Sequence, residues 1–135
     1  MIKENYHRLQ TGQAGEYLAA SVLQRHFKTI AFPDLPAPYD LVAESYSGDF
    51  LRCQVKTADA VSVINGYRYW QYNTAKGTLC YTDDEIDFFA LVCLPRRLVC
   101  FQAFENTTAM SRLREDDFTE RTEMETLNEV LGEHL

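Results

Sequence analysis

The chain has 135 residues, of which 46% are hydrophobic and 24% are charged, a composition typical of a globular domain that excludes a disordered chain. This length predicts one domain, residues 1–135, with a core of its own. The sequence has no run of 18 apolar residues, and its first residues, MIKENYHRLQTGQ, lack the apolar core of a signal peptide. We therefore expect a cytoplasmic protein without a membrane segment.

The net charge of −7 is unevenly distributed along the chain. Residues 115–135 hold eight acidic residues and one basic residue, which gives −7, whereas residues 1–114 hold 12 of each kind. The acidic excess therefore lies in the last part of the chain. The neutral remainder does not exclude a nucleic-acid partner.

The cysteine and histidine patterns favour neither a zinc site nor a cysteine nucleophile. The four cysteines show no C-x-x-C spacing, and the three histidines are far apart in the sequence. Buried free thiols in a reducing compartment are the simplest interpretation of the cysteines.

The segment TGQAGEYLAASVLQRHF is expected to form the first helix, with Thr11 as its N-cap and apolar residues at helical spacing. Residues 31–40, AFPDLPAPYD, follow with three prolines in six positions. Because proline cannot continue a helix or an inner strand, this segment is predicted to be a stiff connection.

Residues 39–58, YDLVAESYSGDFLRCQVKTA, are predicted to form a β-hairpin with a three-residue loop at 46–48. Gly48 supplies the left-handed residue that such a loop requires. With this loop the numbers of paired residues sum to 94, so Asp40 is placed opposite Gln54, and Lys56 lies two residues further along the same face.

Three more strands are expected at GYRYWQYN, EIDFFALVCL and LVCFQAF, followed by an acidic helix at about 119–135. In that helix Met124, Leu127, Val130 and Leu131 share one side. The order of helix, strands and helix predicts an α/β or α+β domain with helices packed on a central sheet.

Glu16 lies on the core-facing stripe of the first helix, because it shares a face with Ala20, Leu23 and Phe27. A buried carboxylate without a cation is unfavourable by several kcal/mol. Small residues such as Gly15 allow the helix to approach the sheet closely, so Glu16 is expected to reach the hairpin cluster.

These residue types suit phosphodiester hydrolysis, which uses a divalent cation to neutralise charge and activate water. Mg²⁺ prefers oxygen ligands at about 2.1 Å. Asp40 would be the main carboxylate ligand, with the Gln54 side chain and the Val55 main-chain carbonyl as neutral ligands. Glu16 would bind the ion directly or through a water molecule. Lys56 would orient the nucleophile and stabilise the transition state.

The arrangement resembles the PD-(D/E)XK nuclease superfamily in Gly15-Glu16, in Pro38-Tyr39-Asp40 and in Gln54-Val55-Lys56. It is most similar to the group I intron-associated homing endonucleases of that superfamily, in which glutamine replaces the usual acid before x-Lys. The likeness covers about residues 11–105. The literal Pro-Asp pair, Pro33-Asp34, lies in the proline-rich connection, whereas Asp40 begins an apolar strand and is the preferred candidate.

The resemblance implies a restriction-endonuclease-like core, with a central mixed sheet of about five strands flanked by helices. It implies Mg²⁺-dependent cleavage of double-stranded DNA, with Mn²⁺ as a substitute, by a homodimer or homotetramer of bacterial or phage-type context. The catalytic residues would be Glu16, Asp40, Gln54 and Lys56, and the metal ligands Asp40, Gln54, Val55 and Glu16.

Cationic and aromatic residues supply candidate contacts to DNA phosphates and bases. These candidates are Arg52, Arg68, Tyr69, Lys76, Arg96 and Arg97.

Two other functions remain open at this stage. A nuclease fold without catalysis, acting by binding DNA or a protein partner, is suggested by the acidic tail and by Gln54, which removes one negative charge from the site. A DNA mimic is suggested by acidity alone, but it requires acidic residues spread over one broad face rather than gathered in the last 21 residues.

Overall fold

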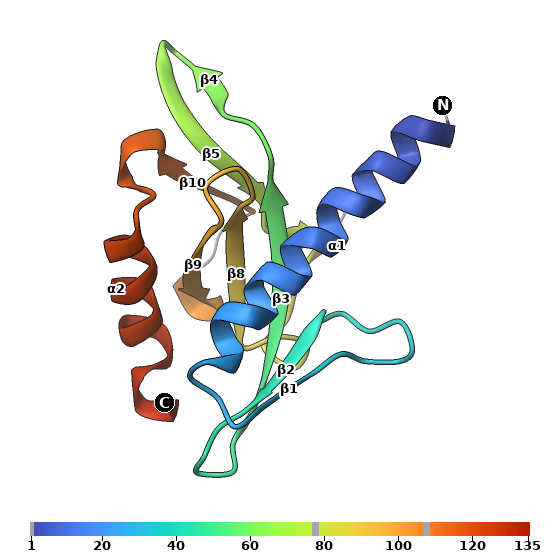
Figure 1. The fold of residues 1–135 in the computed structure, drawn as a ribbon, viewed down its shortest axis with the longest axis vertical. Helices are drawn as coiled ribbons and strands as arrows, with labels where there is room; N and C mark the ends of the chain where they lie inside the picture. Colours follow the sequence, from blue (N-terminus) through green and yellow to red (C-terminus); the bar gives the residue numbers. More distant parts are fainter. Residues whose placement is uncertain (1, 77–78, 107–108) are drawn as a thin grey trace.

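The computed structural model of the chain describes residues 2–76, 79–106 and 109–135, and its centre is a five-stranded sheet (Figure 1). In spatial order the strands are β1 (Thr29–Ala31), β2 (Leu41–Glu44), β3 (Phe50–Ala58), β8 (Phe88–Cys93) and β9 (Leu98–Ala103). Strands β3 and β8 are parallel, and the other neighbours are antiparallel. The predicted mixed sheet of about five strands flanked by helices is confirmed, although β1 was not among the predicted strands.

Helix α1 (Ile2–Gln24) crosses one face of this sheet and begins nine residues earlier than predicted. The prediction of Thr11 as its N-cap is wrong, because Thr11 lies inside the helix. Residues 2–10 contain neither glycine nor proline, so nothing in them stops the helix from extending upstream. This first half of α1 projects beyond the sheet (Figure 1).

The core on the α1 side is built by alternation in the strands and by helical spacing in α1. Ala19, Leu23 and Phe27 pack there against inward residues of the sheet such as Val55 and Phe88. Ala19 and Leu23 are four residues apart on α1, and Phe27 follows three residues after the helix ends at Gln24, so one stripe of α1 lies on the sheet.

Helix α2 (Glu120–Leu131) packs beside β9, the edge strand of the sheet. Its Glu123 carboxylate accepts a hydrogen bond from Val99 N (2.7 Å), and the Thr126 hydroxyl accepts one from Phe101 N (3.0 Å). These two α2 side chains thus accept hydrogen bonds from backbone N–H groups of the edge strand. The edge strand is therefore hindered from pairing with a further strand. On the apolar side of α2, Leu127 and Leu131 are buried, whereas Met124 near the helix start is 47% exposed.

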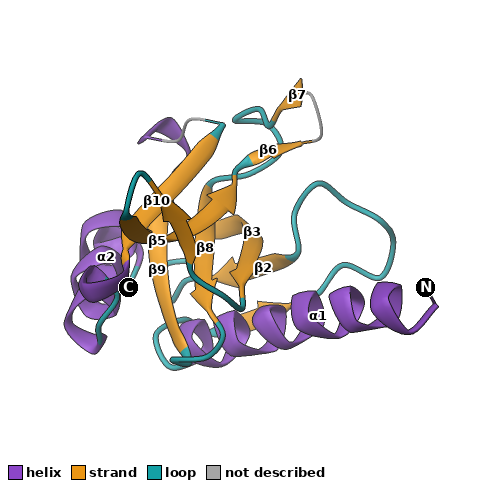
Figure 2. Ribbon diagram, turned by 90° about the horizontal axis from the view of Figure 1, so that it is seen from above, coloured by secondary structure: helices purple, strands orange, loops and turns teal. Residues whose placement is uncertain are grey.

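A second, three-stranded sheet covers the other face of the central sheet. It consists of β10 (Met110–Arg114), β5 (Tyr67–Asn73) and β4 (Ser62–Ile64), with β5 in the middle. The aromatic strand predicted at GYRYWQYN is therefore a strand of this second sheet, where Trp70 and Tyr72 pack against Phe89 and Leu91. In Figure 2 the long helix α1 runs along the opposite side of the central sheet.

Short elements complete the chain. They are the two-stranded ribbon β6 (Ala75–Lys76) and β7 (Leu79–Cys80), and the 3₁₀ helices η1 (Phe104–Asn106), η2 (Glu115–Asp117) and η3 (Gly132–His134). Three cysteines, Cys53, Cys93 and Cys100, are free and buried. Within the described residues, no helix combines the length and the apolar character needed to span a membrane.

The β2–β3 hairpin has the predicted register. Leu41 pairs with Cys53 and Glu44 with Phe50, so the paired numbers sum to 94. Gly48 has a φ of 95° and donates its N–H to the Ser45 carbonyl, which closes the three-residue loop. The turn at Gly48 therefore sets which residues of β3 face the start of β2.

Candidate active site

Asp40 lies where the β2–β3 ladder ends. The last strand pair is Leu41 with Cys53, and Asp40 N donates to the Cys53 carbonyl (2.8 Å). Beyond this pair the Val55 N–H has no strand residue opposite it, and the Asp40 carboxylate accepts that N–H (2.9 Å). The N–H and C=O of one residue in a strand point to the same side, so the Val55 carbonyl faces the same open edge.

Glu16 approaches Asp40 from α1, and the two carboxyl groups share a hydrogen bond. Burial, together with the negative charge of Asp40 and this hydrogen bond, raises the pKa of Glu16 from 4.5 to about 7. Burial also raises the pKa of Asp40, although the Val55 N–H, Glu16 and the positive charge of Lys56 act in the opposite direction. Two adjacent acids with raised pKa values indicate negative charge that the protein alone does not neutralise.

Gly15 explains how Glu16 comes so close to the sheet. A Cβ atom at Gly15 would lie 2.8 Å from Cβ of Thr57 and 2.9 Å from its Cγ2, and still nearer to its hydroxyl oxygen. The backbone of α1 therefore rests directly on the Thr57 side chain of β3. The predicted close approach of a small residue is borne out at this position.

Gln54 and Lys56 place polar atoms at the same part of β3. The Gln54 amide nitrogen lies 3.5 Å from the Val55 carbonyl oxygen. The Lys56 ammonium donates to the Tyr81 hydroxyl (3.2 Å) and lies 5.2 Å from the centroid of that ring. The candidate residues thus come from α1 (Glu16), the position before β2 (Asp40) and β3 (Gln54, Val55 and Lys56).

A groove of about 340 Å³ opens beside Lys56, between α1 and the end of β3. Its α1 wall contains two basic side chains that were not singled out from the sequence, His7 and Arg8, and both are exposed. The groove is lined by His7, Arg8, Thr11, Gly12, Val55, Lys56, Thr57 and Asp59. Arg8 on α1 and Lys56 on β3 both contribute to the lining of this groove, so its walls include positively charged residues from both elements.

The oxygen atoms of this cluster fit a hard divalent cation. Two carboxylates, a main-chain carbonyl and an amide are ligands that Mg²⁺ accepts in proteins. Nowhere in residues 2–76, 79–106 and 109–135 do three or more His, Cys, Asp or Glu side chains gather into a metal-binding group. An ion held here would therefore have two acidic side chains, Glu16 and Asp40, and otherwise neutral ligands.

Arg52, a candidate DNA contact, is engaged within the protein. Its guanidinium donates to the Asp87 carboxylate (3.1 Å) and to the main-chain carbonyls of Asp83 and Asp84. Burial raises the pKa of Asp87, but the hydrogen bonds and the positive charge of Arg52 outweigh burial, so this pKa lies below its ordinary value. Arg52 thus holds the turn before β8 against β3.

The other candidate DNA contacts lie outside the cluster. Arg68 pairs with Glu115 (3.1 Å), and Arg96 donates to the carbonyls of Glu115 and Phe118 and lies over the Trp70 ring. Arg97 is exposed in the turn after β8, and Tyr69 is half-buried in β5. The side chain of Lys76 lies outside the described residues.

Tyr81 is the main member of the cluster that sequence reasoning missed. It is 9% exposed, and its ring packs edge-to-face on Phe89 with centroids 5.7 Å apart. Because Tyr81 lies between β7 and β8, no strand alternation could assign it to the face of Lys56.

Two comparisons with known proteins find a match to this chain. The family model described as PD-(D/E)XK endonuclease matches residues 6–128. The fold is similar to that of a bacterial homing endonuclease, I-Ssp6803I, with a TM-score of 0.63 and 20% identity over 83% of this chain and 81% of that chain. A search of curated proteins finds no match.

Proposed function

The chain belongs to the PD-(D/E)XK endonuclease family, and on that premise we propose that it is a Mg²⁺-dependent endodeoxyribonuclease of the homing type. Its reaction is the hydrolysis of phosphodiester bonds in double-stranded DNA. The observation that carries this proposal is the pair of adjacent carboxyl groups, Glu16 and Asp40, on the strand edge that also presents Lys56.

The residues that would hold the metal ion are Asp40, Glu16, the Val55 carbonyl and the Gln54 side chain. When bound, a divalent cation neutralises developing negative charge and lowers the pKa of an attacking water. The raised pKa values of both acids support this assignment, because a cation between them would relieve their mutual repulsion. Mn²⁺, which accepts the same ligands, is expected to replace Mg²⁺.

Lys56 and Glu16 have distinct roles in the proposed reaction. The ammonium of Lys56, held by Tyr81, stabilises negative charge on the phosphate as the bond breaks. Glu16, whose pKa is about 7 without a metal ion, would lose its proton when a cation binds beside it and would then serve as a ligand. Gln54 orients its amide toward the same edge without adding charge.

The groove beside Lys56 is the proposed path of the cleaved strand. Its basic residues Arg8 and His7 lie on α1, so a phosphate backbone in the groove would contact both α1 and β3. One groove of this kind would hold one DNA strand. Cutting both strands requires a second copy, and we infer a homodimer or homotetramer.

The proposal is tested with supercoiled plasmid and cognate-site DNA in the presence of Mg²⁺ or Mn²⁺. Wild-type protein is expected to produce nicked and linear DNA, whereas Asp40→Ala and Lys56→Ala lose at least about 1,000-fold in rate. Lys28→Ala is the matched control, because Lys28 is exposed and pairs only at 4.0 Å with Glu44. Equal cleavage by all four proteins would assign the activity to a contaminant or to another site.

The second candidate function is a nuclease fold that binds DNA or a protein partner without cleaving. It is favoured by Gln54 and by the limit of two acidic ligands in the described cluster. Calorimetry separates the two: no binding of Mg²⁺ or Mn²⁺ by wild-type protein, together with intact plasmid, would support the non-catalytic function.

A further inference from the structure

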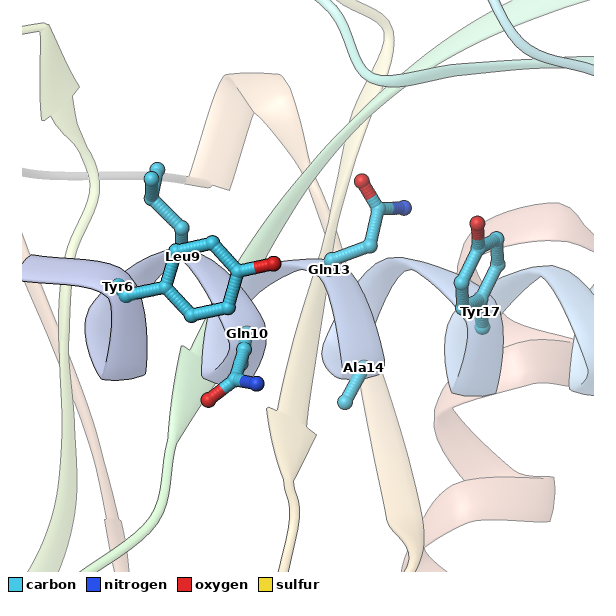
Figure 3. Close-up of a pocket in the computed structure, with 6 residues that line it drawn as sticks. All are labelled: Tyr6, Leu9, Gln10, Gln13, Ala14 and Tyr17. Atoms are coloured by element: carbon cyan, nitrogen blue, oxygen red, sulfur yellow. The ribbon is translucent and has the colours of Figure 1, made fainter. Parts of the chain in front are cut away.

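The side of α1 that faces away from the sheet carries an apolar surface. Tyr6, Leu9 and Tyr17 are 62%, 70% and 61% exposed. Together with Gln10, Gln13 and Ala14 they line an open hollow of about 400 Å³, and Figure 3 shows their six side chains along one length of the helix. These six residues, here called the α1 outer face, contain no charged side chain.

This surface extends into the proline-rich connection. The Tyr17 ring packs edge-to-face on Phe32, which is itself 46% exposed, with centroids 6.0 Å apart. Three aromatic rings and Leu9 at these exposures amount to roughly 500 Å² of accessible surface. That is about three fifths of the roughly 800 Å² per partner of a standard protein interface, and apolar patches of this size are often functional on a folded protein.

The sequence of the α1 outer face is complementary to itself. When two copies of α1 lie antiparallel so that facing residue numbers sum to 23, Tyr6 meets Tyr17, Leu9 meets Ala14, and Gln10 meets Gln13. Each match is favourable: ring against ring, a large against a small side chain, and an amide that both donates and accepts. The positions 6, 9, 13 and 17 have the spacing of a helix–helix seam.

The absence of charge within these six residues also selects among partners. DNA and anionic membranes are attracted by lysine and arginine, and none lies on the α1 outer face. A surface bearing one sign of charge would repel its own copy across a two-fold axis, whereas this neutral one does not.

We propose that the α1 outer face binds a second copy of this chain, with the two α1 helices antiparallel across a two-fold axis. This inference rests on the proposed function. The dimer would supply the second active site that cleavage of both DNA strands requires. The opposite side of each α1 keeps its contact with Thr57, its Glu16 carboxyl group and its groove. Both sites therefore stay accessible in the dimer.

Sedimentation velocity over a wide range of protein concentrations tests the interface without any need for cleavage. Wild-type protein is expected to sediment as a dimer, or as a tetramer built from dimers. Leu9→Glu is expected to raise the dissociation constant about 100-fold or more, because each dimer would bury two carboxylates. Val63→Glu is the matched control, since Val63 is 63% exposed on β4, away from α1.

A pair of double variants tests the antiparallel register. Gln10→Glu with Gln13→Glu places like charges opposite each other and is expected to dissociate the dimer. Gln10→Glu with Gln13→Lys places opposite charges there and is expected to retain it. Both positions are exposed, so each variant is expected to fold, and circular dichroism checks this.

Three results would overturn the proposal. They are a wild-type protein that is monomeric at every concentration, a Leu9→Glu variant that remains dimeric, and a Val63→Glu variant that dissociates as much as Leu9→Glu does. Equal dissociation of the two double variants would overturn the antiparallel register. Lys56→Ala separates this proposal from the nuclease proposal, because it is expected to abolish cleavage and leave the dimer intact.

Discussion

The position of the Lys56 ammonium is defined by its neighbour Tyr81. Tyr81 accepts its hydrogen bond and presents its ring to the ammonium, and Phe89 fixes the ring from the core. A lysine side chain has four rotatable bonds, so these contacts restrict where its charge lies. Tyr81 is therefore a positioning residue for Lys56.

Tyr81→Phe removes the hydroxyl and keeps the ring. A hydrogen bond to a charged group contributes about 1.5–3 kcal/mol, so we expect kcat to fall about 10- to 100-fold with little change in KM. Steady-state cleavage of an oligonucleotide duplex measures both constants.

Tyr72→Phe provides the matched control for this experiment. The Tyr72 hydroxyl donates to the Val92 carbonyl in the core (3.0 Å), away from Lys56. Its loss is expected to lower the melting temperature and leave kcat unchanged. A larger loss of kcat in Tyr72→Phe than in Tyr81→Phe would contradict the positioning role.

Glu16 gives the protein a characteristic pH dependence in the absence of metal. Its pKa is about 7 in the folded state and 4.5 in the unfolded chain, so the folded state binds more protons between these values. Stability is therefore expected to fall as pH rises from about 5 to 7. After allowance for solvent screening, the effect is about 1 kcal/mol, or about 4 °C in melting temperature.

Glu16→Gln is expected to flatten this dependence, because the amide carries no titrating proton. Thermal melts with EDTA at pH 5 and pH 7.5 measure it for both proteins. An unchanged difference between the two pH values in the variant would show that another group is responsible.

At the scale of elements, α1 brings together three features on different sides: the contact with β3, the Glu16 carboxyl group and the α1 outer face. Its closest approach to the sheet is at Gly15, where the helix backbone lies against the Thr57 side chain. Alanine normally stabilises a helix by about 1 kcal/mol relative to glycine. A glycine-to-alanine substitution therefore stabilises the protein where there is room for the new Cβ atom and destabilises it where there is not.

Gly15→Ala is expected to destabilise the protein by about 1–3 kcal/mol, because α1 or Thr57 must move, and to reduce cleavage by displacing Glu16. Gly12→Ala in the same helix has nothing within 4 Å of its new Cβ atom and is expected to be neutral or stabilising. Chemical denaturation measures both free energies of unfolding. Stabilisation of similar size by both variants would contradict the close contact at Gly15.

The hairpin shows which part of this architecture local sequence determines. Loop length and Gly48 were enough to derive the pairing of β2 with β3, and hence the place of Asp40 beside the segment of β3 that holds Gln54 and Lys56. The second sheet could not be derived in this way. Strand β10 pairs with β5 across more than 35 residues of sequence, so neither segment carries a local signal of the other.

Two features of the candidate site also had no local signal. Tyr81 reaches Lys56 from a connecting segment without periodicity, and the basic groove forms because α1 extends upstream of the predicted Thr11 cap. Sequence reasoning could place Glu16, Gln54 and Lys56, which lie on regular elements, and Asp40, which directly precedes β2, because helical period and strand register assign their positions.

At the scale of the molecule, the acidic tail does not oppose the proposed path of DNA. Helix α2 lies on one flank and the projecting half of α1 on the opposite flank in both Figures 1 and 2. Within the tail, Glu115 is paired with Arg68 and Glu123 caps the edge strand β9. The negative charge is therefore separated from the groove that contains Arg8 and Lys56.

The central claim is that α1, the start of β2 and β3 together build one divalent-metal site. The anomalous scattering of a crystal soaked in Mn²⁺ tests it most directly. We predict one ion at about 2.1–2.3 Å from carboxylate oxygens of Asp40 and Glu16, with the Val55 carbonyl and the Gln54 amide oxygen completing the protein ligands. An ion bound elsewhere, or no ion between Asp40 and Glu16, would contradict the account.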